Sequence, residues 1–141
     1  MVTAALPAQD HGRTALRLLL AEDSEDDAEL LLYALGKAGF DVDCQRVDSE
    51  PGLCQALAQA RWDLVISDHN MPGFSGSRAL SIVHGQAPGL PFLFVSANPS
   101  EETLADDQRL GVSRSFIKGK LAGLGPAILA LLAAARRQGS G

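Results

Sequence analysis

The chain has 141 residues, of which 46% are hydrophobic and 21% are charged, a balance typical of one globular domain. The formal net charge is −5, and the sequence has no basic stripe, which argues against a nucleic-acid partner. No apolar run reaches the roughly 20 residues that a membrane-spanning helix needs. Residues 1–14 lack the features of a signal peptide. We therefore expect a cytoplasmic protein with no membrane partner.

Apolar, strand-like runs alternate with segments of helical period from residue 15 onward. Strands are predicted at 16–21, 42–47, 64–67, 92–96 and 115–118, and helices at 28–38, 51–60, 77–84, 101–110 and 124–135. Ser24 followed by Asp27 is typical of a helix start. Residues 1–14 are predicted to be a flexible tail, 15–138 one domain, and 139–141 a linker or cloning remnant. Cys44 and Cys54 are interpreted as buried thiols.

This alternation predicts an α/β fold with right-handed crossovers between parallel strands. Five such units fit a flavodoxin-like, doubly wound, five-stranded parallel sheet with helices on both faces and strand order 2-1-3-4-5. In open sheets of this kind, ligands bind at the edge formed by the carboxyl ends of the strands.

Polar side chains follow four of the five predicted strands. Glu22 and Asp23 follow the first strand, and Asp68 follows the third. Ser96 ends the fourth strand, and Lys118 ends the fifth. Because the carboxyl ends of these strands meet at one edge, we expect the five side chains to lie close together. Three neighbouring carboxylates repel one another, so the arrangement calls for a cation.

Each of these residues also has a simpler interpretation when it is taken alone. Glu22 and Asp23 fit acids near the start of a helix, where the helix dipole favours negative charge. Asp68 fits a turn residue, Lys118 a solvated strand end, and Ser96 a structural hydroxyl. These explanations would have to hold independently at four places, so the joint pattern favours a functional site.

Five short motifs occur in a consistent order on these elements. They are Ala21-Glu22-Asp23-Ser24, Ser67-Asp68, Met71-Pro72-Gly73 with Gly76, Ser96-Ala97, and Lys118. Together they resemble the receiver domain of two-component response regulators, and the resemblance runs from about residue 16 to residue 137. Each motif is weak alone, but the ordered set is a specific signal.

The resemblance implies that Asp68 accepts a phosphoryl group from a phosphohistidine on a histidine kinase or a histidine phosphotransfer protein. A carboxylate is a recognised nucleophile for this chemistry, and Mg²⁺ would neutralise the charge that opposes the attack. The resemblance assigns Mg²⁺ to Glu22, Asp23, Asp68 and the backbone carbonyl of Asn70. Glu22 replaces the more usual Asp in this set.

Three further groups are implied to receive the phosphoryl oxygens. They are the Lys118 ammonium, the Ser96 hydroxyl and the backbone N–H of Ala97. These groups stabilise charge in place, without proton transfer. Asn70 and Asn98 occupy the positions that line the path of the hydrolytic water in this family, and they leave the lifetime of the phosphate open.

The sequence departs from the family pattern at two positions near Lys118. Ser115 stands where the family has a switch aromatic, and strand alternation would point the neighbouring Phe116 to the other face. Gly119 stands where the family usually has Pro. We therefore expect phosphorylation to remodel the face of the fourth helix, fifth strand and last helix with weaker coupling than usual.

The leading functional interpretation is a phosphorylation-controlled interaction module that binds an unknown downstream protein as a monomer or weak homodimer. It would not be an enzyme beyond assisting its own phosphoryl transfer and dephosphorylation. A Mg²⁺-dependent phosphohydrolase is disfavoured, because such enzymes place a second acid where Asn70 stands. A phosphorylation-independent interaction module of the same fold is the other alternative. The sequence leaves open whether the domain stands alone or is part of a larger protein.

Overall fold

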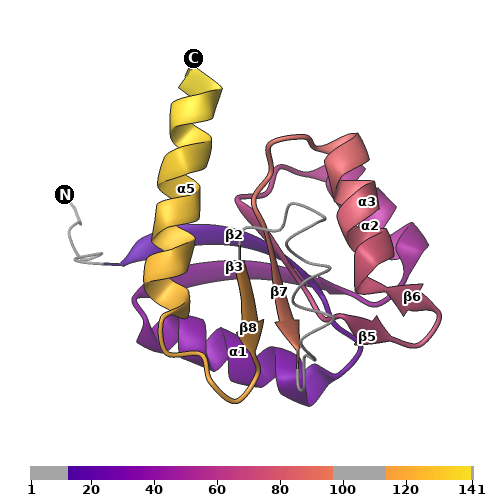
Figure 1. Cartoon of the computed structure of the whole chain (residues 1–141), viewed down its shortest axis with the longest axis horizontal. Coiled ribbons are helices and arrows are strands. Elements are labelled where there is room, and N and C mark those ends of the chain that lie inside the picture. Colours follow the sequence, from indigo (N-terminus) through magenta and orange to yellow (C-terminus); the bar gives the residue numbers. More distant parts are fainter. Residues whose placement is uncertain (1–12, 97–113, 141) are drawn as a thin grey trace.

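The computed structural model describes residues 13–96 and 114–140 (Figure 1). The strands are β2 (Thr14–Ala21), β3 (Phe40–Val47), β4 (Leu64–Ser67), β5 (Asn70–Met71), β6 (Phe74–Ser75), β7 (Phe92–Ser96) and β8 (Arg114–Ile117). The helices are α1 (Glu25–Lys37), α2 (Glu50–Gln59), α3 (Gly76–Gln86) and α5 (Leu124–Ser140). The helix predicted at 101–110 lies outside the described residues.

Five parallel strands form one sheet in the order β3-β2-β4-β7-β8, which confirms the predicted order 2-1-3-4-5. The register places Ala21 opposite both Val47 and Ser67, and Ser96 opposite Ile117. The carboxyl ends of neighbouring strands therefore lie at the same edge of the sheet. This alignment positions the residues that follow each strand.

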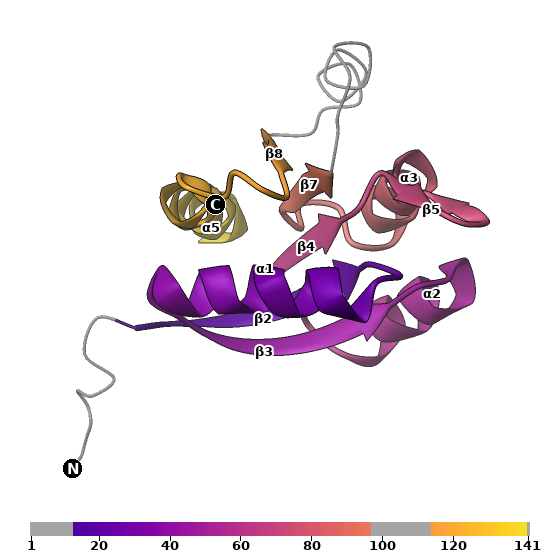
Figure 2. The ribbon, with the colours of Figure 1, turned by 90° about the horizontal axis from the view of Figure 1, so that it is seen from below.

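Helices cover both faces of the sheet, as Figures 1 and 2 show. Leu18 and Leu20 of β2 belong to a core shared with α1 and α5. Leu19, between them, belongs to the opposite core, which is shared with α2 and α3. Successive side chains on a strand point to opposite faces, so a strand covered on both sides is apolar throughout. This explains the continuous apolar runs in the sequence.

Serine hydroxyls cap the first turn of three helices. The Ser24 Oγ accepts a hydrogen bond from the backbone N–H of Asp27 (3.2 Å), which confirms the helix start predicted there. The Ser49 Oγ caps α2 and the Ser75 Oγ caps α3 in the same way. Each cap satisfies a backbone N–H that has no partner within the helix.

A short antiparallel hairpin, β5 and β6, follows β4 in the chain and leads into α3, and the sequence pattern did not predict it. Gly73 forms its turn with φ of +71°, a conformation that glycine adopts without strain. Met71 and Phe74 are buried against the core of α2 and α3. Two-residue strands are too short to show an alternating pattern, which is why the hairpin was missed.

Both cysteines are free thiols, but they are half-buried rather than buried as expected. Cys44 lies on β3, one of the two edge strands of the sheet, so among the described strands β3 pairs on one side only. Cys44 and Cys54 pack against the two opposite cores, so the sheet separates them.

The element ends differ slightly from the predictions. β2 begins at Thr14 and β3 at Phe40, and α5 continues to Ser140, past the start of the predicted linker. In the part of the chain that the structure describes, no helix combines the length and the apolar character needed to cross a membrane. The cytoplasmic location stays a prediction.

Candidate functional site

Backbone hydrogen bonds extend the sheet one residue beyond the strand ends. The Asp68 N–H donates to the carbonyl oxygen of Ala21 (2.9 Å), and the Lys118 N–H donates to that of Ser96 (2.8 Å). The Ser67 hydroxyl donates to the carbonyl oxygen of Asp68 (2.9 Å). Asp68 and Lys118 are therefore held by the sheet itself at its carboxyl edge, where open α/β sheets bind ligands.

The three predicted carboxylates converge at this edge. Glu22, Asp23 and Asp68 each offer an oxygen, and these oxygens lie within 4.8 Å of one another. Glu22 is 4% exposed and Asp68 is 8% exposed, whereas Asp23 is open to solvent. Mg²⁺ prefers a few carboxylate oxygens and keeps several waters. An all-oxygen donor set with one solvent-facing member fits such an ion.

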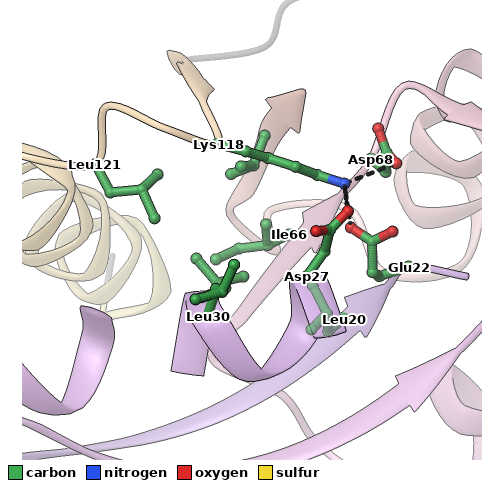
Figure 3. Close-up of a pocket in the computed structure, with 10 residues that line it drawn as sticks. Leu20, Glu22, Asp27, Leu30, Ile66, Asp68, Lys118 and Leu121 are labelled. Carbon is green, nitrogen blue, oxygen red and sulfur yellow. Dashed lines mark hydrogen bonds and ion pairs between the residues drawn. The ribbon is translucent and has the colours of Figure 1, made fainter. Parts of the chain in front are cut away.

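The Lys118 ammonium lies among three carboxylates rather than in solvent (Figure 3). Its Nζ is 2.7 Å from Asp27 Oδ2, 2.9 Å from Glu22 Oε1 and 3.2 Å from Asp68 Oδ2. The interpretation of Lys118 as a solvated strand end is therefore wrong. The side chain extends from the end of β8 and contacts residues at the end of β2, at the end of β4 and on the first turn of α1.

Burial and charge act against each other in this cluster. Burial raises the pKa of Glu22, and the charge on Asp68 adds to the rise, while hydrogen bonds from Lys118 and the Ser24 N–H oppose it. Burial disfavours the charged form of Lys118, but its hydrogen bonds to Asp27, Glu22 and Asp68 outweigh this and raise its pKa above the ordinary value. Lys118 is thus a fixed cation, and the surrounding carboxylates outnumber it.

Two charged residues of this cluster were missed by the sequence analysis. Asp27, on the first turn of α1, makes the shortest contact with Lys118. Arg46, near the end of β3, donates to the carbonyl oxygen of Glu22 (2.9 Å) and pairs with Glu25 (3.4 Å). The sequence placed Asp27 only at the start of a helix, and no local pattern connects it with Lys118, 91 positions away. Nothing in the sequence singled out Arg46.

Of the remaining predicted site residues, the structure describes Ser96 and Asn70. Ser96 is 2% exposed. Its Oγ has no hydrogen-bond partner, and among the described residues no other buried side-chain nitrogen or oxygen lacks one. Such an atom is rare and calls for an explanation. Ala97 and Asn98 lie outside the described residues. Asn70 begins β5, and its carbonyl as a fourth metal ligand stays a prediction.

Comparison with known proteins assigns the family. The model of the response regulator receiver domain matches residues 18–120. The chain belongs to this receiver domain family. The fold and the order of the strand-end residues agree with the resemblance found in the sequence.

Curated relatives of this receiver domain are larger proteins. The response regulator protein FleR of Pseudomonas aeruginosa is 32% identical over 104 residues, which are 74% of the chain and 22% of FleR. The sensory/regulatory protein RpfC of Xanthomonas campestris pv. campestris is 32% identical over 128 residues, which are 88% of the chain and 17% of RpfC. The chain thus spans about a fifth of the length of these relatives.

Solved receiver domains share the fold. The receiver domain of the sensor histidine kinase PA1611 from Pseudomonas aeruginosa PAO1 superposes with a TM-score of 0.70 at 19% identity. The match covers 85% of this chain and 99% of that one. In that structure a magnesium ion is coordinated in the active-site cleft.

The receiver has no aromatic side chain at the position of Ser115. Ser115 is half-buried on β8. Phe116 is also half-buried, and it packs against the core of α1 and α5. Gly119, which follows Lys118, is exposed. Position 115 therefore lacks the aromatic side chain that is usual in the family, and Phe116 packs against the core instead.

A small pocket of about 30 Å³ lies beside the charged cluster. The carboxylates of Glu22, Asp27 and Asp68 and the ammonium of Lys118 form its polar end (Figure 3). Apolar side chains form the rest of its wall, namely Leu20, Leu30, Leu31, Ile66, Val95 and Leu121. The low-polarity wall strengthens the electrostatic interactions of the charged groups.

Proposed function

We propose that Asp68 accepts a phosphoryl group from a phosphohistidine of a histidine kinase or histidine phosphotransfer protein. A carboxylate oxygen of Asp68 would bond to phosphorus as the phosphorus–nitrogen bond of the donor breaks, and the electron pair of that bond would leave with the imidazole nitrogen. The observation that carries the proposal is the place of Asp68, 3.2 Å from Lys118 and within one acidic cluster with Glu22 and Asp23.

Mg²⁺ is the cofactor that this cluster supports. Glu22, Asp23 and Asp68 would hold it, and the magnesium ion in the PA1611 receiver supports this assignment. The bound ion supplies neutralisation of the negative charge that opposes attack by one anion on another. Glu22 has a longer side chain than the usual Asp, and we propose that it acts through a water molecule.

Lys118 and Ser96 would stabilise the transferred group. Lys118 is a fixed cation within reach of Asp68, and its ammonium suits phosphoryl oxygens as a point charge. The buried Ser96 hydroxyl ends the strand next to Lys118 and has a donor to offer. These groups act by preorganised charge rather than by proton transfer.

We further propose that phosphorylation changes binding to a downstream protein and that the domain is not an enzyme toward other substrates. Asn70 supports this, because a phosphohydrolase of this type needs an acid there. A constitutive interaction module of the same fold makes the opposite prediction, that Asp68→Ala leaves partner binding unchanged. A monomer or weak homodimer remains our expectation.

The decisive experiment is phosphorylation by acetyl phosphate and by phosphoramidate, with and without Mg²⁺, followed by intact mass. We expect the wild type and the Asp26→Ala control to gain one phosphoryl group only with Mg²⁺. Asp68→Ala should gain none. A folded wild-type protein that gains no phosphoryl group from either donor would contradict the proposal.

A further inference from the structure

Lys118 has no hydrogen-bonding capacity to spare in this structure. An ammonium group carries three N–H donors, and three carboxylate oxygens lie within 3.2 Å of the Lys118 Nζ. Glu22 and Asp68 belong to the acidic group that suits a metal ion. Asp27 does not belong to that group, yet it makes the shortest of the three contacts (2.7 Å).

Asp27 is not engaged in capping its own helix through its side chain. In a capping box, the acid at this position accepts a hydrogen bond from the backbone N–H of the cap residue, Ser24. Here Glu22 Oε2 lies 3.2 Å from that N–H and accepts it. The Ser24 Oγ still caps the backbone N–H of Asp27. The carboxylate of Asp27 is therefore available to Lys118 without loss of the helix cap.

A phosphoryl group on Asp68 would need a donor from Lys118, so the ammonium would have to move away from the carboxylates that hold it now and toward the new anion. Asp68 would carry the phosphoryl group, and Glu22 would turn to the metal ion. Asp27 is left as the anion that competes with the phosphoryl oxygens for Lys118. It is also the most exposed of the three, with 37% of its side chain accessible against 6% for Glu22 and 10% for Asp68.

We propose that Asp27 is a positioning residue that draws Lys118 toward α1 and thereby disfavours the phosphorylated state of the receiver. The inference rests on the proposed function, because it concerns the anion that Asp68 would carry. The carboxylate of Asp27 would act on the reaction only through Lys118. Removing its charge while keeping its size should free the ammonium for the incoming anion.

The test measures the affinity for beryllofluoride, a phosphoryl mimic, at saturating Mg²⁺ by calorimetric titration. We expect Asp27→Asn to bind beryllofluoride about fivefold more tightly than the wild type, which corresponds to about 1 kcal/mol for a partly exposed ion pair. Asp27→Glu keeps the charge and should stay close to the wild type. Asp26→Asn is the matched control, since Asp26 is an exposed acid on the same turn of α1.

The outcomes separate the two proposals. A gain in Asp27→Asn alone supports the inference, and a folding defect cannot produce it because a damaged α1 would weaken binding. Equal or weaker binding by Asp27→Asn, compared with Asp26→Asn, would overturn the inference and leave the proposed function intact. If neither the wild type nor Asp27→Asn binds beryllofluoride, the phosphoacceptor function fails and the inference fails with it.

Discussion

Gly76 lies so close to Asp68 that a Cβ atom on it would stand 2.9 Å from the carbonyl oxygen of Asp68. The same atom would lie 2.7 Å from Phe94 Cε1 and 2.9 Å from the Cα of His69. The Gly76 N–H also donates to the carbonyl oxygen of His69 (3.0 Å). The first residue of α3 is thus packed directly onto the loop that carries the proposed acceptor, and only glycine fits there.

Replacement of Gly76 by alanine should therefore disturb both the fold and the site. We expect Gly76→Ala to lower the free energy of unfolding by about 1–3 kcal/mol, because the added methyl group meets backbone atoms. Phosphorylation by acetyl phosphate should also slow as the loop at Asp68 shifts. Urea denaturation and a time course of intact mass would measure the two effects.

Gly85 provides the control for this substitution within the same helix. A Cβ on Gly85 would meet no atom within 4 Å, so Gly85→Ala should stabilise the protein by about 0.5–1 kcal/mol. Equal changes in stability for the two variants would show that the contact between Gly76 and the Asp68 loop does not matter.

Mg²⁺ should stabilise the folded chain through the acidic cluster. A ligand that binds only the folded state at 100 times its Kd adds about 2.7 kcal/mol to the free energy of unfolding. Asp23 is the exposed member of the cluster, so Asp23→Asn should leave the fold intact and lose most of this gain. Thermal denaturation over a Mg²⁺ series, at constant ionic strength, checks this expectation.

The control for charge alone is Asp26→Asn, which should keep the full Mg²⁺ effect. Asp26 lies on α1, outside the group of carboxylates that could hold an ion. A Mg²⁺ effect that persists in Asp23→Asn, or that disappears in Asp26→Asn, would argue against the proposed ligand set.

The fold was predictable because its signals are local and repeated. Residues 18–21 and 64–67 are buried on both faces of the sheet, so they are apolar without an alternating pattern. The Ser24 cap marks the start of α1 in the sequence as it does in the structure. The hairpin at Met71 and Phe74 was missed because its burial comes from tertiary contact with α2 and α3.

Most residues of the site could be predicted from the sequence, but the contacts between their side chains could not. Glu22, Asp68 and Lys118 were found because each follows a strand and the strand ends share one edge. The Ser24-x-x-Asp27 pattern was interpreted as a helix cap, which is true of the backbone of Asp27 and not of its carboxylate. The contact between Asp27 and Lys118 joins residues 91 positions apart, and no local pattern reports such a pair.

Ser115 leads to a prediction about how far the effect of phosphorylation spreads. On addition of Mg²⁺ and beryllofluoride, backbone amide signals near Asp68 and Lys118 should shift strongly, while those of α5 should shift little. The reason is that position 115 lacks the aromatic side chain and Phe116 is held in the core of α1 and α5. Two-dimensional ¹H–¹⁵N spectra measure both regions, and a large shift throughout α5 would refute weak coupling.

Cys44 should react slowly with alkylating agents in the folded protein. Burial, with the nearby charge of Asp43, raises its pKa from 9.0 to about 11. The thiolate is the nucleophile, and about two pKa units lower its fraction about 100-fold at pH 8. Because a thiolate of higher pKa is more nucleophilic, the net loss of rate is smaller, about tenfold.

The raised pKa of Cys44 also makes the stability of the fold depend on pH. The folded-state pKa lies above the unfolded value, so the protonated thiol stabilises the fold fully below pH 9, and this contribution is lost as the pH rises through 11. In a Cys54→Ser variant, which leaves Cys44 as the only thiol, iodoacetamide should modify the folded chain about tenfold more slowly than the urea-unfolded chain at pH 8. The difference should shrink as the pH approaches 11, and equal rates at pH 8 would show that β3 does not shield this thiol.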